Sequence, residues 1–157
     1  MKKFELTAES KINIFGKKLF RIKALISFGD VEEGETGGWI EKEENLEQSS
    51  GNAWVYGNAE VYGNAEVYGN ARVSGNAEVS GNADYTTIHG FGTQFRTTTF
   101  FQCEDKQIRV SCGCFLGTIP EFREQVKNTR EGKIAEEYLM IADLMEKHFV
   151  KEKESGE

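Results

Sequence analysis

Apolar and polar positions recur with a period of six through the middle of the chain. Residues 51–86 are six consecutive hexads, GNAWVY, GNAEVY, GNAEVY, GNARVS, GNAEVS and GNADYT. Within a hexad the alanine and the residue two positions later lie on one face of a short strand, because side chains alternate along a strand. The Gly-Asn pair that opens each hexad tolerates a positive φ, which a sharp corner requires. Strands and corners that repeat in this way predict a solenoid.

The hexads resemble the hexapeptide repeat of left-handed parallel β-helices, in which three hexads form one coil of a triangular prism. In that fold an aliphatic residue and a small residue four positions later point into the prism. Val55 with Ala59, and Val61 with Ala65, have this spacing. The resemblance therefore implies a short left-handed parallel β-helix with two regular coils of 18 residues.

The 18-residue period predicts which outward side chains of the hexads lie above one another. The expected pairs are Trp54 with Arg72, Glu60 with Glu78, and Glu66 with Asp84. Stacked like charges cost stability and add nothing to a core, so these acids are predicted to contact a partner. The alternative is a solvated face that only keeps the solenoid soluble.

The residues before the repeat are predicted to cap its first coil, since an open solenoid edge needs a cover. Residues 11–26 contain two extended stretches around a turn at 15–17, with alternating apolar positions in the second stretch. They predict a β-hairpin. Residues 37–50 keep a strand-and-turn composition without the hexad register, and Trp39, Ile40 and Leu46 are the expected inward residues of an irregular coil.

After residue 86 the pattern changes to a hairpin followed by two helices. Residues 97–103 and 107–112 flank a short turn and predict an antiparallel pair. Thr118 and Glu121 form a capping box with a proline between them, so a helix is expected from Ile119. Apolar residues spaced by three and four predict a second helix over 133–151, with His148 on its apolar stripe.

The expected fold class is thus mainly β with a C-terminal α/β part. The expected domains are an N-terminal hairpin cap over 1–36, a left-handed β-helix over 37–86, a hairpin with two helices over 87–151, and a frayed tail over 152–157. No apolar run approaches the ~20 residues that a membrane span needs. The first ten residues have no apolar signal core, which predicts an intracellular, cytoplasmic protein.

The net charge of −7 is unevenly distributed along the chain. Residues 30–47 carry eight acids and one lysine, whereas residues 1–29 carry seven bases and two acids. Most of the surface should repel phosphate, so direct nucleic-acid binding is disfavoured and a basic protein partner is expected. The predicted contact residues are Glu32, Glu33, Glu35, Glu41, Glu43, Glu44, Glu60, Glu66, Glu78 and Asp84.

Three cysteines in an intracellular chain do not indicate a disulfide framework. Cys112 and Cys114, two apart on a strand, are expected to place both sulfurs on one side, where they can bind Zn²⁺ with His89 and His148. Cys103 is expected to lie too far along the hairpin to join them. Such a zinc would be structural. The alternative is that the thiols are free and packed.

Longer segments also resemble a family of phage and prophage proteins. The resemblance rests on GGWIEKEENLEQSSGNAWVYGNAEVYGNAEV, TTTFF, CGCFLGTIPEF and AEEYLMIADLMEKHF. Members join a GNAxV solenoid to a small α/β module with a C-G-C-F motif. Relatives often have a His-Gly pair where this chain has Thr129-Arg130, which shifts the expected metal ligation to His148.

The phage setting implies an inhibitor of a bacterial defence nuclease, of the anti-CRISPR type, acting in the cytoplasm of the host cell. A rigid acidic prism could occupy the basic nucleic-acid channel of an RNA-guided nuclease with little ordering cost. Because both ends of the repeat carry other modules, a monomer or small homo-oligomer is expected.

Three alternatives remain at this stage. The chain could be a virion-associated or self-assembling structural module. It could be a hexapeptide-repeat acyltransferase, but no histidine precedes His89, and a fold alone does not indicate an activity, so no enzyme is predicted. It could sequester a signalling nucleotide, but the repeated Gly-Asn corners are turns and indicate no phosphate-binding loop.

Overall fold

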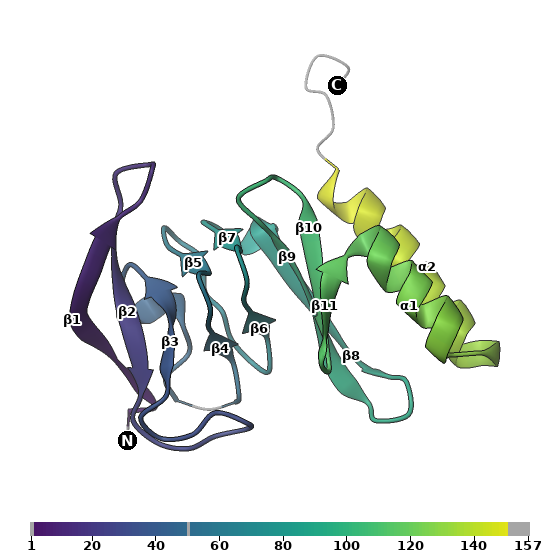
Figure 1. Ribbon diagram of the computed structural model, residues 1–157, viewed down its shortest axis with the longest axis horizontal. Coiled ribbons are helices and arrows are strands. Elements are labelled where there is room, and N and C mark those ends of the chain that lie inside the picture. The colour runs from purple at the N-terminus through teal and green to yellow at the C-terminus, as the bar shows by residue number, and fades with distance from the viewer. Residues whose placement is uncertain (1, 50, 151–157) are drawn as a thin grey trace, which may run out of the picture.

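The structure is a computed structural model that describes residues 2–49 and 51–150. Sheets succeed one another from the N-terminal hairpin to a C-terminal sheet that carries both helices (Figure 1). The strands are β1 (Phe4–Ile12), β2 (Lys18–Ala24), β3 (Thr36–Ile40), β4 (Trp54–Val55), β5 (Glu60–Val61), β6 (Arg72–Val73), β7 (Glu78–Val79), β8 (Tyr85–Phe91), β9 (Arg96–Gln102), β10 (Ile108–Cys112) and β11 (Phe115–Thr118). The helices are η1 (Glu43–Asn45), η2 (Asn82–Asp84), α1 (Ile119–Thr129) and α2 (Gly132–Phe149).

The strands of the described ranges form three sheets. A five-stranded mixed sheet has the order β1-β2-β3-β5-β7, antiparallel from β1 to β3 and parallel from β3 to β7. A second sheet contains only β4 and β6, which are parallel. The third is a four-stranded antiparallel sheet of order β11-β10-β9-β8. The predicted pairing of residues 97–103 with 107–112 is therefore confirmed.

The expected fold class, a short left-handed parallel β-helix capped at both ends, is wrong. The hexad strands are only two residues long, and their parallel pairing is partial. The strands β5 and β7 extend a sheet that begins with the antiparallel hairpin β1–β2, so this part of the repeat belongs to a mixed sheet. The hexad over 63–68 makes only one isolated bridge, between Leu46 and Val67. Glycine-containing corners occupy most of each hexad and leave too few residues for continuous parallel sheets.

Two of the three expected stacks are present. Trp54 pairs with Arg72 and Glu60 pairs with Glu78, both at an offset of 18 residues. Strand pairing does not continue to Glu66 in the described part of the hexads; instead its backbone N–H donates to Asn82 Oδ1 at 2.9 Å.

The first apolar core lies inside the hexads and beneath the N-terminal hairpin. The predicted inward residues of the hexads are fully buried there, as are Ile40 and Leu46, while Trp39 is almost fully buried in a small cluster with Leu19 and Tyr62. Trp54 was expected to face outward, but it is also fully buried. Its ring meets the edge of the Phe28 ring at 5.3 Å between centroids, because the segment after β2 folds over it.

The C-terminal sheet separates this core from a second one beneath the helices. On β9, Phe101 packs into the hexad core, and its neighbour Phe100 packs against α1 and α2. The capping box of Thr118 and Glu121 is present, and α1 begins at Ile119 as predicted. The predicted second helix is also present, but His148 is exposed near its C-terminal end and not buried on the stripe. The predicted tail over 152–157 lies outside the described residues.

No helix within residues 2–49 and 51–150 combines the length and the apolar character needed to cross a membrane.

Candidate functional site

The C-G-C motif forms a tight turn and does not continue a strand. Cys112 pairs with Phe115, so Gly113 and Cys114 are the two residues that connect β10 to β11. Gly113 has φ +62°, as the first position of a type II′ hairpin turn requires. The chain reverses between the two cysteines, and their sulfurs do not share a side as predicted. Cys112 accepts a hydrogen bond from Thr98 Oγ1 at 3.2 Å, whereas Cys114 is exposed in a groove on the other side.

The structure does not bring the four expected metal ligands together. His89 is exposed on β8, and His148 is exposed near the end of α2, where its ring contacts Phe149. Among the residues with described positions, no group of three or more His, Cys, Asp or Glu side chains is arranged to hold a metal ion. Cys103 lies in the hexad core, where burial raises the pKa of its thiol to about 12. Zinc binding stays a prediction without a donor set, and nothing below depends on it.

The stacked acids Glu60 and Glu78 are occupied by lysines of the same chain. Lys11 Nζ lies 2.9 Å from a carboxylate oxygen of Glu60, and Lys106 Nζ lies 3.9 Å from one of Glu78. The Glu78 side chain is only 11% exposed. These two predicted contact residues are therefore covered from inside the molecule.

Glu78→Gln should stabilise the protein at neutral pH. Burial raises the pKa of Glu78; Lys106 opposes this effect, and Glu60 adds to it. A carboxyl group whose pKa is higher in the folded than in the unfolded state reduces stability once it is ionised, so the neutral amide should raise the free energy of unfolding at pH 7. The gain should disappear as the pH falls through the raised pKa toward about 4.3, where unfolded glutamate also takes up its proton. Urea unfolding at several pH values measures this.

Glu104→Gln is the matched control, because Glu104 is exposed on the adjacent turn. It should change the free energy of unfolding by less than about 0.5 kcal/mol. A loss of stability in Glu78→Gln at pH 7 would show that the ion pair with Lys106 outweighs the burial of the carboxylate.

The other predicted contact acids differ in how far they are committed. Glu41 accepts a hydrogen bond from the Gly63 backbone N–H, Glu43 forms an ion pair with Lys2, and Asp84 accepts hydrogen bonds from Ser80. The exposed acids of this set are Glu32, Glu33, Glu35, Glu44 and Glu66. The first three lie in the turn before β3, and the last two share a hollow.

We call this feature the acidic hollow and define it by Glu44, Glu47, Glu66, Tyr68 and Asn82. It has a volume of about 510 Å³ and adjoins a second hollow that also contains these three glutamates. Tyr68 is 63% exposed. Glu47 and Tyr68 were not among the predicted contact residues, although the acidic run over 30–47 and the Tyr at the end of a hexad were visible signals.

The hollow is held in shape by bonds to the hexad backbone. Glu47 Oε1 accepts from the Gly69 N–H at 2.9 Å, and Asn82 Oδ1 accepts from the Glu66 N–H. The Tyr85 hydroxyl donates to the Glu66 carbonyl oxygen, and burial raises the pKa of this phenol well above its usual range. The carboxylates are therefore presented from a rigid support.

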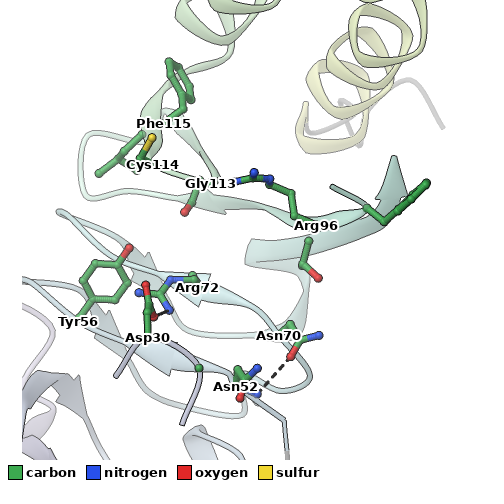
Figure 2. Close-up of a pocket in the computed structure, with 14 residues that line it drawn as sticks. Asp30, Asn52, Tyr56, Asn70, Arg72, Arg96, Gly113, Cys114 and Phe115 are labelled. Carbon is green, nitrogen blue, oxygen red and sulfur yellow. Dashed lines mark hydrogen bonds and ion pairs between the residues drawn. The ribbon is translucent and has the colours of Figure 1, made fainter. Parts of the chain in front are cut away.

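A larger groove, of about 720 Å³, separates the hexads from the β10–β11 turn. Figure 2 shows Arg72, Asp30 and Tyr56 on the hexad side and Arg96, Gly113 and Cys114 on the opposite side. The sequence analysis assigned no role to this groove, although Arg72 is the only basic residue of the six hexads. It is the largest concave site in the described part of the chain for which a volume is known.

Comparison with known proteins follows from this geometry. No protein-family model matches the chain. A search of curated proteins finds no significant match either. The resemblance to phage proteins therefore stays a prediction, and function must be argued from the sites themselves.

Proposed function

We propose that this chain is an acidic binding protein that inhibits a bacterial defence nuclease by occupying a basic surface of it. The observation that carries the proposal is the acidic hollow, in which three glutamates surround an exposed tyrosine. A Lys or Arg side chain that enters this hollow can contact carboxylates and the Tyr68 ring together, which combines ionic and cation–π attraction.

Two further properties support this role. The carboxylates are fixed to the hexad backbone, so a partner has little side-chain freedom to remove on binding. The net charge of −7 also favours rapid encounter with a basic channel that normally holds nucleic acid. The hollow contains carboxylates, an amide and a phenol but no nucleophile with an adjacent base, which supports binding and not catalysis.

The double variant Glu44→Lys/Glu66→Lys should abolish inhibition. Purified RNA-guided nucleases are tested by biolayer interferometry and by target-DNA cleavage. At least one should bind the unaltered protein, with affinity that falls about 10-fold or more when salt is raised from 0.1 to 0.5 M. The double variant should bind it about 100-fold more weakly, because two attractions become repulsions.

Glu124→Lys/Glu136→Lys is the matched control, with the same change in net charge at two exposed positions on the helices. It should retain binding within about threefold, because only long-range steering is reduced. Equal losses in the two double variants would show that net charge acts alone and that the hollow is no contact site. Tyr68→Ala, which leaves the charge unchanged, separates the contribution of the ring.

A further inference from the structure

The groove of Figure 2 is a cationic site in an acidic protein. It contains two arginines and one aspartate among its lining residues, whereas the whole chain has a net charge of −7. It shares no lining residue with the acidic hollow. A basic partner that binds the hollow gives no reason for two guanidinium groups to face each other across a groove.

Arg72 is held in place before any ligand arrives. Its guanidinium carbon lies 4.9 Å from the centroid of the Tyr56 ring, and its backbone N–H donates to Thr99 Oγ1 at 3.1 Å. One terminal nitrogen also binds Asp30, whose side chain is 74% exposed. An ion pair to such an exposed carboxylate is weak, and an arginine has five N–H donors, so donors remain for an anion.

Arg96 approaches the groove from the other wall across Gly113. A Cβ atom on Gly113 would lie 2.1 Å from a terminal nitrogen of Arg96, so only glycine leaves room for this side chain. Arg96 itself is exposed and forms no ion pair within residues 2–49 and 51–150. Its full charge is therefore available to a ligand.

Phe95, next to Arg96, adds an aromatic surface in an unfavourable backbone conformation. It has φ +52°, a region that bulky residues rarely adopt, and its ring is 69% exposed. Strain of this kind concentrates at ligand-binding sites, where the side chain is needed in one position. Leu116 and the carboxamides of Asn52 and Asn70 also line the groove.

We propose that this groove binds a nucleotide, with its phosphate between Arg72 and Arg96 and its base against Phe95. Planar guanidinium groups suit phosphate oxygens, an aromatic ring suits the face of a base, and carboxamides can hydrogen-bond to base edges. The volume is in the range of small-molecule sites. A nucleic-acid strand fits less well, because beyond the groove it would meet a surface of strongly negative net charge.

Isothermal titration with AMP, GMP, CMP and UMP tests the proposal. At least one should bind with a dissociation constant below about 100 µM, and its nucleoside and inorganic phosphate should each bind about 10-fold more weakly or worse. Arg96→Gln should weaken binding about 10-fold or more without changing thermal stability, because Arg96 is exposed and unpaired. Arg123→Gln is the control, since Arg123 pairs with Asp143 and Glu146 on the helices.

Phe95→Gly separates a ligand contact from a structural role. Glycine adopts positive φ readily, so this variant should keep or raise the melting temperature while it weakens nucleotide binding. The proposal is wrong if none of the four nucleotides binds, if Arg96→Gln binds as tightly as the unaltered chain, or if inorganic phosphate binds as tightly as a nucleotide. It is also wrong if a hexa-aspartate peptide binds this groove and the nucleotides do not.

Discussion

Gly37→Ala is expected to destabilise the protein by about 3 kcal/mol or more, which would leave a marginally stable domain partly unfolded. Gly37 lies in β3, where the chain passes close to β4. A Cβ atom there would be 2.6 Å from Ile22 Cγ1 and 2.7 Å from both Trp54 Cζ2 and the Val55 carbonyl oxygen. Val55 is a backbone contact on a strand fixed by its pairing with β6, so it cannot move aside cheaply. Urea unfolding followed by tryptophan fluorescence measures the loss.

Gly81→Ala provides the control for this substitution. Gly81 has extended backbone, with φ −160°, and a Cβ atom there would meet nothing within 4 Å. Its replacement should change the free energy of unfolding by less than about 0.5 kcal/mol. Equal losses at the two positions would contradict the close packing of β3 on β4.

Asn45→Asp should cost about 3–5 kcal/mol at pH 7, although the two side chains have nearly the same shape. Asn45 is fully buried. Its Oδ1 accepts from the N–H groups of Glu41 and Lys42, and its Nδ2 donates to the carbonyl oxygens of Gly63 and Ala65 at 3.3 and 2.9 Å. The substitution replaces the donating group by an ionised oxygen that faces two carbonyl oxygens, and it buries an unpaired charge.

The acid dependence of this variant distinguishes lost hydrogen bonds from a change of shape. Near pH 3 the new carboxyl group is protonated in both states and can donate, so part of the lost stability should return relative to the unaltered chain (about half, if one of two donated bonds is restored). Asn64→Asp, at an exposed hexad corner, is the control and should stay within about 0.5 kcal/mol. A loss that is independent of pH would contradict this account.

Local patterns in the sequence predicted local structure well. The valine and alanine spacing identified the buried residues of the hexads, and the Thr118 and Glu121 pair identified the start of α1. The hairpin register that places Cys112 opposite Thr98 also followed from the turn at 104–106. Each of these signals depends on residues that are close in sequence, and each was decided before distant segments met.

The errors came from contacts between distant segments. The expected β-helix failed because β3 joins β5 to the N-terminal hairpin, and nothing inside a hexad encodes that pairing. Trp54 is buried because residue 28 covers it. The acids Glu60 and Glu78 are covered by lysines 49 and 28 residues away in sequence, from Lys11 and Lys106. The cysteine error was local, since a glycine between two cysteines also permits a two-residue turn.

The alternate burial of Phe100 and Phe101 links the evolution of the two halves of the molecule. One strand supplies the floor of both apolar interiors, so a substitution on either face is constrained by a different set of neighbours. Recombination that exchanged the helical end for another module would have to carry a replacement for β9 whose hexad-facing side still matched the old partner. The repeat and the helical end are therefore expected to be inherited together and not shuffled as separate cassettes.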